Sequence, residues 1–274
     1  MTKRLKLACL AASVAMIAGP ASADHWWGGY HWSISSAPLQ LTIVDNVSGP
    51  WESVLDTSIA DWNASNVLSL SKAAGSGSTR NCKAETGTVM VCNDSYGYNG
   101  WLGIAQIWLS GDHITKGVTK LNDSYYNTPT YNTTAWRNLV SCQEIGHAFG
   151  LAHQDEDFDN PNLDTCMDYT SNPESNQHPN QHDYDMLEQI YGHTHSSGGS
   201  SGDGGGPPPG RGKNKGLSGS DDIGNFALGW GRVIGRTADG RPDLYELKLG
   251  DGSRVITHVF HVPGAGRGNA HEHE

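Results

Sequence analysis

The chain has 274 residues and a formal net charge of −11, so it can bury a sizeable core and is too acidic to resemble a nucleic-acid binder, whose surface is basic. Hydrophobic residues make up only 36% of it, and its 35 glycines are an excess, which indicates that part of the chain lies outside a packed core. A fully disordered chain is excluded, because nine tryptophans and ten tyrosines need an interior in which to pack.

Residues 1–23 are typical of a signal peptide. Three basic residues precede a short apolar run, and Ala21-Ser22-Ala23 matches a cleavage signal. The apolar run is too short to cross a bilayer, and no later stretch is long enough. We therefore predict a mature chain that begins at Asp24, without membrane insertion, in the extracellular space or the periplasm. An uncleaved anchor is the alternative.

The mature chain divides into three stretches. Residues 24–193 combine apolar periodicity with turn signals and are predicted to be globular. Residues 194–220 are rich in glycine, serine and proline, which is typical of a flexible linker. Residues 221–274 contain two alternating runs, 243–249 and 254–262, on either side of Gly250-Asp251-Gly252, and so predict a small β-rich segment built on a hairpin.

Within residues 24–193 the elements alternate in type. In chain order we expect a strand at 39–44, a helix at 50–64, a short strand at 89–91, strands at 103–109 and 117–122, a helix at 133–151 and a last helix at 184–191. Thr133 or Thr134 should cap the long helix, which should end near Gly150. This order predicts an α+β fold in which a sheet packs against helices.

Export also bears on the four cysteines of the mature chain. An even number in an exported protein favours disulfides over free thiols, and no C-x-x-C spacing supports a cysteine zinc site. We predict the pairs Cys82–Cys92 and Cys142–Cys166. The first should close a hairpin, because residues 89–91 are strand-like.

The chemistry is concentrated between Ser141 and His153. Gln143 and His147 are four residues apart on the predicted helix, so both side chains leave the same face. Gly150 permits a left-handed turn that can bring His153 back toward His147. A cation among these three side chains would have three protein ligands and one open position, which is the arrangement of a catalytic zinc. Glu144 could reach a water at that position.

This stretch resembles the metzincin metallopeptidases, in their matrixin-like form, whose signature is H-E-x-x-H-x-x-G-x-x-H followed by a methionine turn. The turn corresponds to Cys166-Met167-Asp168-Tyr169. The resemblance implies a twisted mixed sheet on an active-site helix, with 103–107 and 117–122 as edge strands and Met167 beneath the metal. It also places Tyr169 at the zinc, as an oxyanion donor or an extra ligand; a buried core tyrosine is the alternative.

The departure from the signature is Gln143, which stands where the family has its first histidine. An amide oxygen is a weaker zinc ligand than an imidazole. Three interpretations stay open: Gln143 is a ligand, or a water or another side chain replaces it, or the metal is lost. The retained Glu144 favours an active site. The Cys142–Cys166 bridge would join the helix to the methionine turn and preorganise the site.

The predicted function is that of a secreted zinc-dependent endopeptidase acting on peptides or proteins. Zinc would polarise the scissile carbonyl, and Glu144 would take a proton from the metal-activated water. The alternative is a catalytically inactive binding protein on a metzincin scaffold, with the C-terminal hairpin as its working module.

A second cation is a further possibility. Asp155, Asp157 and Asp159 begin like a calcium loop but lack the later residues of an EF-hand. A looser calcium site that includes Glu156 and Asp164 competes with a solvated acidic loop. Residues 151–193 contain ten acidic residues and no lysine or arginine, so basic or neutral peptides should be favoured over acidic ones.

Overall fold

The computed structural model describes residues 25–83, 85–192, 225 and 229–264. The predicted signal peptide at 1–23 and the predicted linker at 194–220 lie outside the described residues. No helix in the described ranges is long and apolar enough to cross a membrane.

The described chain is α+β, with one mixed sheet of nine strands. The order across the sheet is β3-β2-β4-β6-β5-β9-β8-β7, and β1 pairs with β6. The pairs β3–β2, β2–β4, β4–β6 and β1–β6 are parallel. The pairs β6–β5, β5–β9, β9–β8 and β8–β7 are antiparallel. The strands are β1 His31–Trp32, β2 Leu39–Asn46, β3 Leu68–Ala74, β4 Thr88–Asp94, β5 Trp101–Ser110, β6 His113–Asn122, β7 Arg232–Arg236, β8 Pro242–Lys248 and β9 Arg254–His261.

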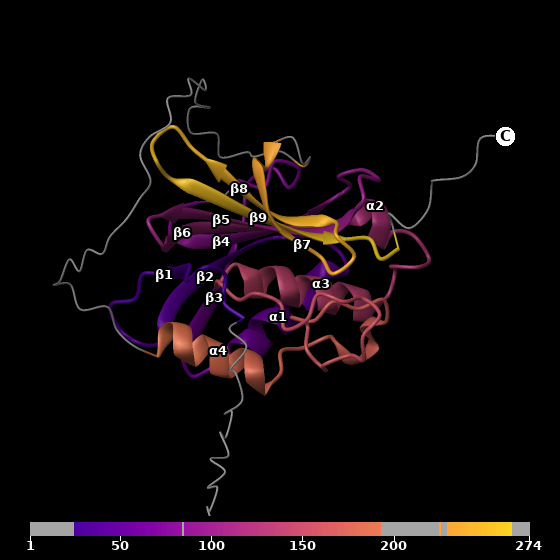
Figure 1. Ribbon diagram of the computed structural model, residues 1–274, viewed down its shortest axis with the longest axis horizontal. Coiled ribbons are helices and arrows are strands. Elements are labelled where there is room, and N and C mark those ends of the chain that lie inside the picture. Colours follow the sequence, from indigo (N-terminus) through magenta and orange to yellow (C-terminus); the bar gives the residue numbers. More distant parts are fainter. Residues whose placement is uncertain (1–24, 84, 193–224, 226–228, 265–274) are drawn as a thin grey trace, which may run out of the picture.

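The longer helices lie together below the sheet in the view of Figure 1. The helical elements are α1 Trp51–Trp62, α2 Asp123–Tyr126, α3 Thr134–His147, the short 3-10 helix η1 Pro173–Ser175 and α4 Gln181–Tyr191. The core on this side contains Trp51 and Trp62 of α1 together with Leu187 and Ile190 of α4. Helix α3 lies between the sheet and the other helices (Figure 1), and all but the first of its residues are buried.

Helix α3 begins as predicted and ends earlier. The Thr133 hydroxyl accepts from Trp136 N at 3.2 Å, so Thr133 is the N-cap. The helix ends at His147 rather than near Gly150, because the following amides bond to carbonyls three residues back; Gly150 N, for example, donates to His147 O. This tight turn leads into Gly150 at φ +94°, a conformation that favours glycine.

Two expectations about strand neighbours are wrong. Strands β5 and β6 are not edges, since β5 lies between β6 and β9 and β6 lies between β4 and β5. Residues 82–92 do not form a hairpin either. Cys82 lies in the connection between β3 and β4, which both pair with β2, in parallel and on opposite sides of it.

The C-terminal strands continue the sheet. Strands β8 and β9 form the predicted antiparallel pair, and β9 also pairs along β5 from Trp101 to Leu109. Ile256 and Phe260 of β9 belong to the core on the helix side, whereas Val255 and Val259 belong to a second cluster. Thus β9 is part of the core that also contains α3.

Candidate metal centre

His147 and His153 meet at the end of α3. The Nε2 atoms of the two imidazoles are 2.9 Å apart, and both residues are buried. The positive φ of Gly150 allows the connection between them, and a Cβ at that position would lie 2.1 Å from Tyr30 O. The sequence-based prediction that this glycine turn brings His153 back to His147 agrees with the geometry.

The outer nitrogens of both rings face acceptors. His147 Nδ1 lies 2.8 Å from Leu151 O, and His153 Nδ1 lies 3.4 Å from a carboxylate oxygen of Glu156. A carbonyl or a carboxylate can only accept, so the Nδ1 atoms carry the protons. Burial lowers the pKa of the His147 imidazole well below its ordinary value and also lowers the pKa of His153. Both rings are therefore neutral at pH 7.

This arrangement fits a bound cation. In neutral imidazoles protonated on Nδ1, the two Nε2 atoms carry lone pairs, and at 2.9 Å these lone pairs repel each other unless a positive charge lies between them. Neutral imidazole is the form that binds zinc, and a hydrogen bond from its other nitrogen is typical of ligating histidines. The donor set therefore fits zinc without any change of protonation.

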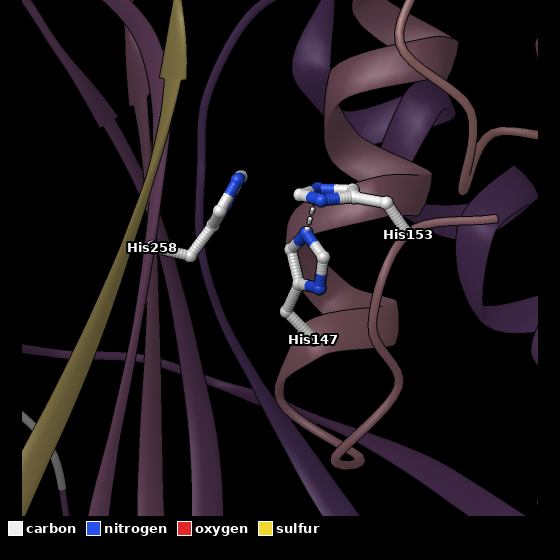
Figure 2. Close-up of side chains that lie close together, drawn as sticks. All are labelled: His147, His153 and His258. Carbon is white, nitrogen blue, oxygen red and sulfur yellow. Dashed lines mark hydrogen bonds between the residues drawn. The ribbon is translucent and has the colours of Figure 1, made fainter. Parts of the chain in front are cut away.

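A third histidine completes the cluster. His258, on β9, offers a ligand nitrogen that lies within 4.8 Å of those of His147 and His153. Figure 2 shows it approaching from a strand, on the side opposite the helix and the loop that carry the other two. Its ring centroid is 4.1 Å from that of His147 and 4.7 Å from that of His153.

Glu144 lies beside this cluster. Its Oε2 is 3.0 Å from His258 Nδ1, and its Oε1 is buried with no hydrogen-bond partner among the described residues. Gly103 makes room for the carboxylate, because a Cβ there would lie 2.9 Å from Glu144 Oε1. Burial raises the pKa of Glu144 well above its ordinary value. A nearby cation would counter that rise by stabilising the carboxylate.

Tyr169 also reaches the site. Its hydroxyl donates to Asp243 Oδ2 at 3.0 Å and lies 2.8 Å from His258 Nε2. Its ring is 4.2 Å from that of His153, and the residue is fully buried. Burial raises the pKa of Asp243, on β8, to about 6. Asp243 and Glu156 also lie close enough to His153 to form a second possible cation group.

The side-chain amide of Gln143 is bonded to the methionine turn. Its Nε2 donates to Cys166 O at 2.7 Å, while its Oε1 is buried and has no partner in the part of the chain that is described. The amide therefore links α3 to the methionine turn. Its predicted role as a metal ligand stays a prediction.

The methionine turn packs under the helix. Met167 is buried, and its sulfur would lie 2.7 Å from a Cβ added at Gly146. Both predicted disulfides, Cys142–Cys166 and Cys82–Cys92, are present. The first joins α3 to the turn, within the core that holds Met167. The second belongs to the other hydrophobic cluster.

Replacing both Cys142 and Cys166 with serine is expected to lower the free energy of unfolding by about 3 kcal/mol. The bridge joins two residues that are 24 positions apart and so restricts the unfolded chain. The double substitution should also weaken zinc binding, since the turn is no longer tied to α3. The matched control replaces Cys82 and Cys92 with serine, which should lower stability and leave zinc affinity unchanged. Denaturant melts and zinc titrations of both variants check this; equal zinc affinities in the two would contradict it.

The acidic residues after His153 cap local turns. The Asp155 and Asp157 carboxylates accept from the backbone amides of Asp157 and Asp159, respectively. Of this run, only Glu156 belongs to a cation-sized group among the described residues. The predicted calcium site stays a prediction.

Sequence reasoning missed His258 and Asp243. The sequence contains one weak indication of His258. It alternates with Ile256 and Phe260, so it is a polar residue on a strand face whose other residues are apolar and should be buried. The neighbouring sequence does not indicate which residues this strand face contacts.

Comparison with known proteins gives little. No family model and no curated protein matches the chain. Two solved structures of myroilysin are similar to it at 12% identity: one with TM-score 0.33, covering 62% of this chain and 98% of the other, and one with TM-score 0.32, covering 60% and 86%. These values do not establish a shared fold.

Proposed function

We propose that the protein is a zinc-dependent endopeptidase of the metzincin type. The observation that carries the proposal is the pair of buried imidazoles whose Nε2 atoms are 2.9 Å apart while each Nδ1 faces an acceptor. The E-x-x-H-x-x-G-x-x-H pattern and the methionine turn support it, because together they resemble the metzincin signature.

The roles follow from position. His147 and His153 would hold the zinc, which would supply Lewis acidity toward a peptide carbonyl and a water. Glu144 Oε1, which has no partner among the described residues, would accept the proton of that water and pass it to the leaving amine. The Tyr169 hydroxyl lies next to the cluster and would turn its proton from Asp243 to the developing oxyanion.

Export is part of the proposal. Its proposed organisation has a signal peptide at 1–23, a catalytic unit at 24–193, a linker at 194–220 and a C-terminal segment at 221–274. The strands of this last segment share one sheet and one core with the catalytic unit. Two disulfides are compatible with an extracellular or periplasmic location. The substrate would be a peptide or protein, with basic or neutral sequences preferred.

A chelator experiment tests the activity. The purified mature protein should contain about one zinc per chain and cleave casein; a chelator should abolish cleavage, and added zinc should restore it. Cleavage that resists the chelator and persists after zinc is removed would contradict the proposal.

A second candidate function is a metal-binding scaffold without catalysis. It is favoured by burial: Glu144, His147 and His258 are all 0% exposed, so a peptide has no path to them in this arrangement. This candidate predicts bound zinc without casein cleavage, and the same experiment therefore separates the two.

A further inference from the structure

We propose that His258, on β9, is the third protein ligand of the metal, in place of the histidine that Gln143 replaces. The proposal rests on the proposed function only in that a divalent metal binds at His147 and His153. It does not require the protein to cleave peptides.

Three histidines converge on one point. Three buried histidines from three separate segments, the end of α3, the loop after Gly150 and strand β9, place one nitrogen each within 4.8 Å of the others (Figure 2). Three histidines and an open position form a common catalytic zinc site.

The contacts of the His258 ring orient it for metal binding. His258 Nδ1 lies 3.0 Å from Glu144 Oε2, so the ring can donate this proton to the carboxylate. A carboxylate on the outer nitrogen is the usual way in which a protein orients a metal-binding histidine. Nε2 is then the unprotonated atom. It lies 2.8 Å from the Tyr169 oxygen, whose proton is donated to Asp243, so a bound cation would relieve the repulsion between the lone pairs of these two atoms.

The register of β9 on β5 brings His258 to the site. His258 lies opposite Ala105 of β5, and Phe260 lies opposite Gly103. The absence of a side chain at Gly103 leaves the space that Glu144 fills, since a Cβ there would lie 2.9 Å from Glu144 Cγ. The same pairing that places β9 on β5 thus places His258 against Glu144. Alternation along β9 puts Ile256 and Phe260, which flank His258 on its face, in the core on the helix side.

Gln143 is the competing ligand, and its contacts favour another role. Its amide nitrogen is bonded to Cys166 O, which holds the side chain against the methionine turn. Its free oxygen is a weaker zinc donor than an imidazole nitrogen. The consequence is that the C-terminal segment completes the metal centre, so that zinc binding and the pairing of β9 with β5 stabilise each other.

Titration of the full mature chain with zinc, and separately with Co²⁺ as a spectroscopic probe, tests this. His258→Asn keeps an amide that can donate to Glu144 and removes the atom at the Nε2 position. We expect the zinc Kd to rise about 100-fold or more, the upper end of the change seen when only the partner of a ligand is lost, and the Co²⁺ absorption to change.

His261→Asn is the matched control, because His261 lies on the same strand and bonds to Pro242 O instead; its Kd should stay near wild type. His258→Gln provides a second variant of similar size, and circular dichroism of the metal-free proteins shows whether each is folded. If folded His258→Asn and His258→Gln bind zinc as tightly as wild type, while His147→Ala does not bind it, this inference fails and the proposed function stands. If wild type binds no zinc, both fail.

Discussion

Replacing Glu144 with glutamine is expected to lower kcat for peptide cleavage by about 10²–10⁴-fold, the usual contribution of a positioned general base. An amide of the same shape keeps a group near His258 Nδ1, so the fold should persist. It cannot accept a proton from water, so the proton transfer is lost. Zinc content at saturating zinc should stay at the wild-type level, because the glutamine oxygen can still accept from His258 Nδ1.

The control for this prediction is Glu188→Gln, at an exposed position of α4. It should leave kcat and zinc content unchanged. Cleavage rates and metal analysis of the two variants check the prediction. A Glu144→Gln enzyme that keeps zinc and most of its activity would show that another group is the base.

Replacing Gly150 with alanine is expected to lower the free energy of unfolding by about 3 kcal/mol or more, which is at the upper end for single substitutions. Two costs add. The backbone is at φ +94°, and a Cβ would lie 2.1 Å from Tyr30 O, a backbone atom that cannot rotate away. Relief of this contact requires the N-terminal segment or the turn to move, and the turn carries His153. Zinc affinity should therefore fall with stability.

Gly87→Ala separates the two costs. Gly87 is at φ +80° and has no atom within 4 Å of an added Cβ, so only the backbone strain of about 1–2 kcal/mol remains. Urea denaturation of both variants checks the difference. Equal losses of stability would mean that the contact with Tyr30 is relieved at no cost.

Local signals in the sequence predicted most of the elements. The apolar spacing of Trp51, Leu55, Ile59 and Trp62 predicted α1, and Thr133 predicted the start of α3. The hairpin of β8 and β9 followed from alternation around a turn. The spacing of His147, Gly150 and His153 was enough to predict that the two histidines meet, because the geometry needed is contained in seven residues.

What the sequence could not predict is the pairing of distant strands. Strand β9 pairs with β5 across some 150 residues of chain, and a stretch rich in glycine, serine and proline between them gives no register. The expected edge position of β5 was wrong for this reason. The contact of His258 with Glu144 depends on the same pairing, so a histidine outside the motif could not be assigned to the site from spacing alone.

The most direct measurement is anomalous diffraction at the zinc absorption edge from crystals of the zinc-loaded mature protein. We expect one strong peak within bonding distance of the Nε2 atoms of His147 and His153, with His258 as the third protein ligand and Gln143 bonded to Cys166 O. A crystal with no peak at His147 and His153, or with zinc only on surface carboxylates, would contradict it.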